Sequence, residues 1–185
     1  MTASFVAFLI ESCSDSFQKM LNNKFCHDMA AANTDREIEN VLKGFKWYMV
    51  QDYFYCEELM RVDAARASNA PTSADVLEGA KHVSKSYEYA QSQLDLCEKS
   101  MGIPKDKALA AERDKATKSY VQFEVSTAQD LDWISSKIAT IPCIQGYYKI
   151  AKKMERESKK KDTVWYQNWV VPNSDWSYCE SQILV

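Results

Sequence analysis

The sequence predicts an all-α protein, and three observations carry this prediction. The chain holds only 4 glycines and 4 prolines in 185 residues, where average usage gives about 13 and about 9. Apolar residues recur at three- and four-residue spacing, which is typical of helices with one buried face. Signals that cap or stop helices delimit segments that are too long for strands. Few turns and long periodic segments together indicate a bundle of long helices.

The expected helices follow from these signals in chain order. They cover residues 4–22, 35–67, 73–99, 105–126 and 128–160, with a short segment at 25–29. A capping box opens the helix at 35, with Thr34 as N-cap and Glu37 three residues later. Thr72 or Ser73 caps the next helix, and the Gly-then-Pro pattern of Met101–Pro104 ends it.

Two aromatic stretches differ from ordinary amphipathic helices. Residues 45–55 carry aromatic side chains on nearly every face, which indicates a helix buried on all sides. The last part of the chain holds Trp165, Trp169 and Trp176, with a break expected at Pro172-Asn173.

Composition and patterning argue against several classes of function. The net charge is -3 and the one basic run, at 152–161, is interrupted by Glu155 and Glu157, so no nucleic-acid partner is expected. A membrane-spanning helix needs about 18 consecutive apolar residues, and no apolar run in the sequence is that long. The cysteines show no CxxC spacing, so we expect free thiols, no metal and no cofactor. These features predict a cytoplasmic protein with a single helical domain over residues 1–185.

Asp52 is the first candidate for chemistry, because it lies amid Trp47, Tyr48, Tyr53 and Tyr55. Burying a carboxylate there is costly unless it is paired or protonated. Two interpretations stay open on the residues alone. Asp52 either has a structural role, facing water or hydrogen-bonding a tyrosine, or it is a functional acid.

Cys143 is the second candidate, because it directly follows Pro142 inside a predicted helix. Proline removes a backbone hydrogen bond and kinks a helix, which leaves free backbone groups beside the thiol. Gly146 permits a close approach from a neighbour. The alternative is a buried structural cysteine beside an incidental kink.

The two histidines carry less weight. His27 could be a haem ligand, but without a glycine-rich partner helix a structural, hydrogen-bonded histidine is favoured. His82 is expected to be exposed, since it lies near Lys81 and Lys85.

Four motifs follow one another in a specific order. They read Phe25-Cys26-His27, then the aromatic helix around Gln51-Asp52, then Ile141-Pro142-Cys143 with Tyr147-Tyr148, then Tyr166-Gln167-Asn168-Trp169 with Asp175-Trp176. In this order the chain resembles the TenA/thiaminase II family, from about residue 17 to its C-terminus. The resemblance implies a haem-oxygenase-like bundle of helices and a homo-oligomer.

The resemblance also implies an activity, because family members hydrolyse amino-pyrimidines and some cleave thiamin. The ligand is then a pyrimidine formed by thiamin breakdown, and the role is thiamin salvage. Asp52 is expected to hydrogen-bond and protonate the ring, which makes the ring electrophilic. Cys143 is expected to add to the activated carbon as a thiolate, before water displaces the enzyme.

Four tyrosines complete the site that the resemblance implies. Tyr55 is expected to stack on the pyrimidine, and Tyr120 to orient the ring or Cys143. Tyr147 is expected to line the pocket or position the catalytic carboxylate, and Tyr48 to bind substrate.

The chain also departs from the family pattern. The family carries a further catalytic glutamate on a last helix, whereas this chain stops at residues 181–185. Lys149 stands where the family has glutamate, and the helix around Glu88 lacks a second acid and a histidine. We therefore expect a bundle without the family's last helix. A protein that binds a pyrimidine or another heterocycle without turnover, or a scaffold, is the alternative function.

Overall fold

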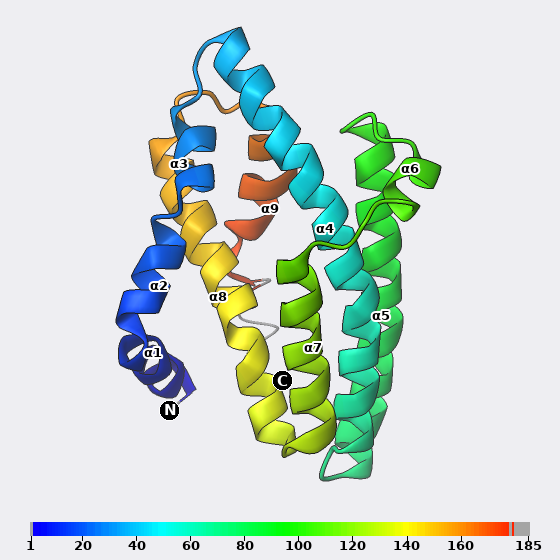
Figure 1. Cartoon of the computed structure of the whole chain (residues 1–185). Coiled ribbons are helices and arrows are strands. Elements are labelled where there is room, and N and C mark those ends of the chain that lie inside the picture. Colours follow the sequence, from blue (N-terminus) through cyan, green and yellow to red (C-terminus); the bar gives the residue numbers. More distant parts are fainter. Residues whose placement is uncertain (1, 178, 180–185) are drawn as a thin grey trace. The chain divides into compact units, whose positions relative to one another are not determined.

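The computed structural model describes residues 2–177 and 179, and its regular elements over them are all helices (Figure 1). The helices are α1 (Thr2–Ser12), α2 (Ser14–Leu21), α3 (Lys24–Ala31), α4 (Asp35–Ser68), α5 (Ser73–Lys99), α6 (Lys105–Leu109), α7 (Lys115–Asp130), α8 (Trp133–Glu157), the π-helix η1 (Tyr166–Val170) and α9 (Val171–Asn173). No strand occurs among these described residues, which confirms the predicted fold class. Residues 181–185, where the family's last helix was expected to be missing, lie outside them.

The predicted helix boundaries at the two long helices are confirmed. Glu37 Oε2 accepts from the Thr34 N–H at 3.0 Å, and Thr34 Oγ1 accepts from the Glu37 N–H at 3.4 Å, so the capping box is formed. Thr72 caps α5 by accepting from the Asp75 N–H. After α5, Gly102 adopts a φ of 65°, a left-handed conformation that suits glycine at a helix end.

Three predictions about helix limits are wrong. The first helix breaks at Cys13, where the Ser12 and Cys13 side chains both hydrogen-bond carbonyls one turn back. The helix expected over 105–126 is interrupted after α6, and α7 starts only at its N-cap Asp114. The break expected between residues 126 and 128 lies inside α7, which ends only at Asp130. Pro172 occupies the first turn of α9, where proline is tolerated, and the break expected there follows at the end of this helix, Asn173.

The described residues form two compact units. The first comprises residues up to Lys43 and from Thr140 onward, and the second comprises Gly44–Ala139. In the first unit the segment just after α8 contacts the end of α3, because the Lys159 N–H donates to the Ala30 carbonyl at 3.0 Å. In the second unit α5 runs along the later half of α4 (Figure 1).

A glycine permits the close approach of α4 and α5 in the second unit. A Cβ on Gly79 would lie 2.6 Å from Ala67 Cβ and 2.9 Å from Ala67 Cα. Backbone atoms cannot yield without moving a helix. A Cβ on Gly146 in α8 would instead meet the flexible end of Met20, 2.6 Å from its Cε.

Because these neighbours differ, the same substitution to alanine should affect the free energy of unfolding differently at Gly79 and at Gly146. Gly79→Ala should destabilise the protein by about 1–3 kcal/mol, because the strain of overpacking exceeds the gain in helix propensity. Gly146→Ala should stay within about 0.5 kcal/mol of the wild type, because Met20 can rotate away. Urea unfolding of both variants measures the difference. Equal stability of the two variants would contradict the packing described for Gly79.

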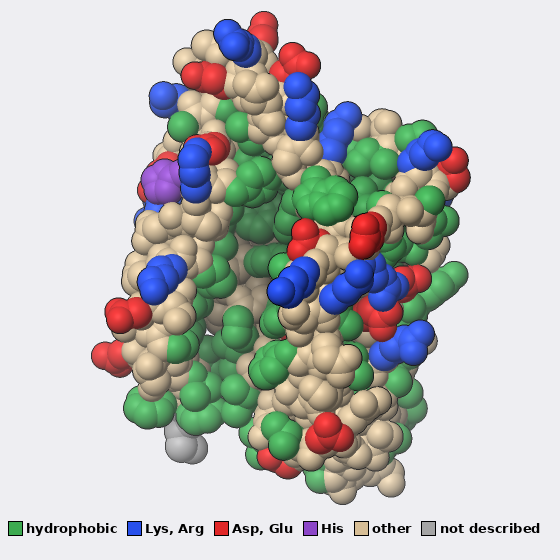
Figure 2. Space-filling view, in the orientation of Figure 1, with side chains coloured by type: hydrophobic (Ala, Val, Ile, Leu, Met, Phe, Trp, Pro, Cys, Tyr) green, Lys and Arg blue, Asp and Glu red, His purple; other side chains and the backbone are tan. Residues whose placement is uncertain are grey.

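The surface of the described residues carries charges of both signs. On the face drawn in Figure 2, acidic and basic side chains are interspersed, and neither forms an extended patch there. No described helix combines the length and the hydropathy that a bilayer crossing requires.

Candidate functional site

One face of α4 carries three of the predicted site residues. Tyr48, Asp52 and Tyr55 are spaced by four and three residues, which places them on one side of a helix. Asp52 is 8% exposed, and Tyr48 Oη donates to Asp52 Oδ1 at 3.2 Å. The open interpretation of Asp52 as a water-facing carboxylate is therefore wrong, whereas a hydrogen bond to a tyrosine is confirmed. The prediction that this helix is buried on all faces is also wrong, since Trp47 is exposed.

Gln51, the neighbour of Asp52, ties α4 to the start of α7. Its amide Nε2 donates to the Glu112 carbonyl at 3.0 Å. Its Oε1 accepts from the Asp114 N–H at 2.7 Å and from Thr117 Oγ1 at 3.0 Å. These bonds satisfy a buried amide and hold the first turn of α7 against the segment of α4 that carries Asp52.

Arg113 makes a second set of contacts between α4 and the loop that precedes α7. Arg113 donates to Glu57 Oε2 and to Glu58 Oε1, each at 2.6 Å, and its guanidinium lies over the Phe54 ring. These contacts draw the loop before α7 onto α4. The helix that begins at Asp114 is therefore positioned by both Gln51 and Arg113.

The position of α7 against α4 places Tyr120 next to Tyr55. Their rings are stacked, with centroids 5.6 Å apart and planes inclined by 18°. Phe123 extends the stack, since its ring centroid lies 6.5 Å from that of Tyr120. Two of the tyrosines proposed to contact a ligand ring are thus brought together in the second unit.

Glu124 is a buried acid behind this tyrosine stack, and sequence reasoning missed it. Its side chain is 1% exposed, and Tyr55 Oη donates to Glu124 Oε1 at 3.3 Å. Burial raises the pKa of Glu124 to about 7, although hydrogen bonds from Tyr120 and Tyr55 oppose the rise. One signal was available, because Glu124 follows Tyr120 by four residues and so shares its helix face.

A polar network lies deeper in the second unit. Asp63 accepts from Arg66 Nη1 at 3.2 Å and from Ser86 Oγ at 2.5 Å. Arg66 also donates to the Ser136 carbonyl at 2.9 Å, which joins α4 to α8. Because Asp63 and Arg66 satisfy one another, Glu124 does not depend on Arg66 as its ion-pair partner.

Cys97 lies near Asp52 but is unsuited to nucleophilic chemistry. Its side chain is fully buried in α5. Burial, with a smaller contribution from the charge of Asp52, raises the pKa of the Cys97 thiol to about 11. Cys97 therefore stays a thiol near neutral pH.

The first unit holds the remaining two predicted site residues, on α8. Cys143 is half-buried and directly follows Pro142, which lies inside the helix as predicted. Tyr147 lies one turn beyond Cys143 on the same face. Its ring contacts Trp169, with centroids 5.4 Å apart and planes inclined by 58°. The close approach expected at Gly146 is confirmed, and Met20 makes it.

Trp169 belongs to η1, a π-helix that was not predicted. A π-helix widens the helical turn and often occurs at functional sites. Tyr166 and Trp169 within it are buried, and Asn173 Nδ2 donates to the Trp169 carbonyl at 2.8 Å. The Trp-rich motif thus supplies a fixed aromatic wall against Tyr147.

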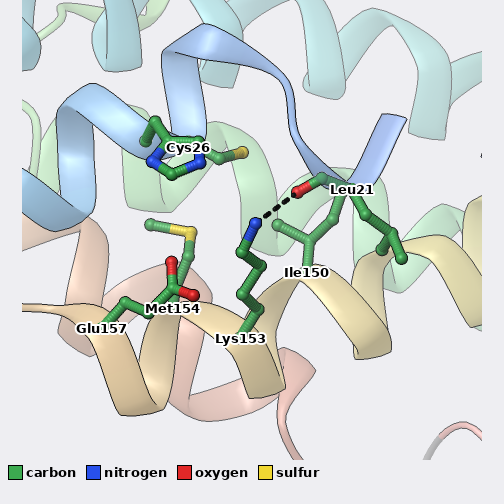
Figure 3. A pocket seen from close by; sticks show the side chains of 7 residues that line it. Leu21, Cys26, Ile150, Lys153, Met154 and Glu157 are labelled. Atoms are coloured by element: carbon green, nitrogen blue, oxygen red, sulfur yellow. Dashed lines mark hydrogen bonds between the residues drawn. The ribbon is translucent and has the colours of Figure 1, made fainter. Parts of the chain in front are cut away.

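A shallow pocket in the first unit is a poor ligand site (Figure 3). Its free space is about 190 Å³ even with the part open to solvent included, and it is lined by Leu21, Cys26, His27, Ile150, Lys153, Met154 and Glu157. Ligand pockets usually measure about 300–1,000 Å³. The Lys153 ammonium already has hydrogen-bond partners within the protein, because its Nζ donates to the Leu21 carbonyl at 3.4 Å and to Asn22 Oδ1 at 2.5 Å.

Neither histidine is placed for metal or haem chemistry. His27 is exposed at the rim of the pocket lined by Leu21, and the haem-ligand interpretation has no support there. The prediction that His82 is exposed is wrong, because its side chain is only 23% exposed and its Nε2 lies 3.7 Å from Glu78 Oε1. Among residues 2–177 and 179, no group of three or more His, Cys, Asp or Glu could hold a metal ion.

The predicted site residues fall into two sets. Asp52, Tyr48, Tyr55 and Tyr120 belong to the second unit, where they form hydrogen-bonded and stacked pairs. The second set, Cys143 and Tyr147, belongs to the first unit and is accompanied by Trp169.

The fold is that of known TenA proteins. A TenA family transcription regulator from Silicibacter sp. TM1040 matches with a TM-score of 0.77 at 21% identity, over 98% of this chain and 76% of that chain. A TenA homologue protein from P. horikoshii OT3 matches with a TM-score of 0.79 at 19% identity, over 98% of this chain and 81% of that chain.

One curated relative is much longer than this chain. It is a protein of Schizosaccharomyces pombe named hydroxymethylpyrimidine/phosphomethylpyrimidine kinase 2, an assignment that its name marks as provisional. The two are 24% identical over 168 residues, which is 91% of this chain and 28% of the yeast protein.

A family model also matches most of the chain. The model of the TENA/THI-4/PQQC family matches residues 19–183. This range includes all four motifs and all six predicted site residues. The resemblance read from the motifs is confirmed, and the chain belongs to the TENA/THI-4/PQQC family.

Proposed function

We propose that this protein hydrolyses an amino-pyrimidine derived from thiamin, with Asp52 as ring acid and Cys143 as nucleophile. Family membership indicates a thiamin-related role. The observation that carries the proposal is Asp52, a buried carboxyl group that accepts a hydrogen bond from Tyr48 at 3.2 Å. Such an acid can donate a hydrogen bond or a proton to a ring nitrogen, without water competing for it.

In the proposed reaction, water replaces an amino group. Asp52 protonates the pyrimidine, and the Cys143 sulfur forms a bond with the activated ring carbon. The bond between the aminomethyl carbon and its nitrogen then breaks, and the nitrogen leaves as ammonia, which gives an exocyclic methylene group. Water adds to that methylene carbon, and the bond between the sulfur and the ring carbon breaks to restore Cys143 and the aromatic ring. The net change is one amine and one water converted into one alcohol and one ammonia.

The tyrosines have supporting roles in this proposal. The stacked pair of Tyr55 and Tyr120 offers a flat aromatic surface on which a pyrimidine can lie. Tyr147, braced by Trp169, lines the side of the site that carries Cys143. The name of the yeast relative agrees with this substrate class, because hydroxymethylpyrimidine is the alcohol that the proposed reaction releases.

The role of Asp52 is tested by an isosteric substitution. With 4-amino-5-aminomethyl-2-methylpyrimidine as substrate, Asp52→Asn should lower kcat/KM for ammonia release by about a hundredfold or more. Asp130→Asn, at an exposed position of α7, should behave as the wild type. Wild-type kinetics in Asp52→Asn would overturn this assignment.

Binding without turnover is the alternative, and a second measurement separates it. If the aminopyrimidine or its hydroxymethyl product raises Tm but no ammonia forms, the protein binds the ring and does not hydrolyse it. If neither compound shifts Tm, a pyrimidine is not the ligand.

A further inference from the structure

We infer that Glu124 is a positioning residue, which holds Tyr55 and Tyr120 as a stacked pair for the ring of the pyrimidine ligand. The inference rests on the proposed function, since it takes the ligand from there. No sequence motif pointed to this acid.

The geometry around Glu124 separates positioning from direct contact. Tyr55 Oη donates to Glu124 Oε1 at 3.3 Å, while the Tyr55 ring stacks on Tyr120 at 5.6 Å. Glu124 itself is 1% exposed, so a ligand lying on the tyrosine rings has no access to its carboxyl group. Any influence of Glu124 on the ligand therefore passes through the tyrosines.

A purely structural ion pair does not explain this acid. The charged groups that act on Glu124 are Arg66 and Asp63, both on α4, and their effects on its pKa are opposite and smaller than that of burial. Arg66 already donates to Asp63 and to the Ser136 carbonyl. The contacts that distinguish Glu124 are those with the two tyrosines.

The protonation state of Glu124 sets the strength of the hydrogen bond that it accepts from Tyr55. Burial raises the pKa of Glu124 to about 7, so its carboxyl group changes charge near neutral pH. The ionised carboxylate accepts a charge-assisted hydrogen bond from Tyr55, which is about twice as strong as a neutral one. The tyrosine pair is therefore held more firmly above pH 7 than below it.

Ligand affinity as a function of pH tests the inference. Calorimetry with 4-amino-5-hydroxymethyl-2-methylpyrimidine should give a wild-type affinity that rises by roughly fivefold across a midpoint near pH 7, relative to Glu124→Gln. Using Glu124→Gln as reference removes the titration of the ligand and of the other groups. Glu112→Gln, whose side chain is 90% exposed, should keep the wild-type profile.

Tyr55→Phe provides a second variant, which keeps the aromatic packing if Glu124→Gln fails to fold. It should lose the same component of the pH profile, because the effect passes through the Tyr55 hydroxyl. A Tyr55→Phe or Glu124→Gln profile identical to that of the wild type overturns the inference.

A measurement without ligand distinguishes failure of the inference from failure of the proposed function. In protein labelled with 3-fluorotyrosine, the ¹⁹F resonance of Tyr55, assigned with Tyr55→Phe, should titrate near pH 7 and cease to do so in Glu124→Gln. This result supports the positioning role even if no pyrimidine binds, in which case the proposed ligand is wrong. A Tyr55 resonance that Glu124→Gln leaves unchanged overturns the inference.

Discussion

Cys143→Ser is expected to lower the rate of ammonia release from 4-amino-5-aminomethyl-2-methylpyrimidine by a factor on the order of a thousand or more. A serine hydroxyl is a far weaker nucleophile than a thiolate, and the variant keeps the size of the side chain, so the loss is chemical. Since Cys143 is half-buried in α8, the change should leave Tm close to that of the wild type.

The chain offers a matched control for this substitution. Cys13 is exposed at the break between α1 and α2, and no role is proposed for it. Cys13→Ser should therefore retain wild-type kcat and KM in the same ammonia assay. Equal activity of the Cys143→Ser and Cys13→Ser variants would exclude Cys143 as the nucleophile.

Arg66→Met is expected to lower the free energy of unfolding by about 3 kcal/mol. The substitution leaves Asp63 buried with Ser86 as its remaining partner, and it removes the donor to the Ser136 carbonyl. Removing one partner of a buried ion pair is costly, because the other charge stays out of water. Urea unfolding gives the difference in free energy.

Arg61→Met is the matched control for the same measurement. Arg61 lies on the same helix and pairs with Glu58, three residues before it, as Arg66 pairs with Asp63. The Arg61 side chain is 75% exposed, whereas that of Arg66 is 17% exposed. Exposed ion pairs contribute little, so Arg61→Met should change stability by less than about 0.5 kcal/mol. Equal losses of unfolding free energy in the two variants would contradict the claim that burial decides how much each ion pair contributes to stability.

Local signals in the sequence predicted the parts of the fold that depend on neighbouring residues. The capping box at Thr34 and the stop at Gly102 rest on contacts within a few residues, and both are formed as expected. The break before α7 was missed, because it depends on Gln51, which lies 61 to 66 residues away from its partners.

The features of the candidate site also fall into those that neighbouring residues predict and those that depend on how helices pack. Asp52 and Tyr48 are four residues apart on one helix, so their hydrogen bond could be anticipated. Glu124 could not be singled out, because its burial and its bond with Tyr55 depend on how α7 packs against α4. The roles of Cys143 and Asp52 came from resemblance and stay predictions.

The proposed hydrolysis is tested most directly by its stoichiometry in ¹⁸O-labelled water. Wild-type protein given 4-amino-5-aminomethyl-2-methylpyrimidine should release one ammonia for each hydroxymethylpyrimidine formed, and mass spectrometry should find one heavy oxygen in that product. The proposal is contradicted if, between about pH 6 and about pH 9, ammonia release does not exceed that of Cys143→Ser.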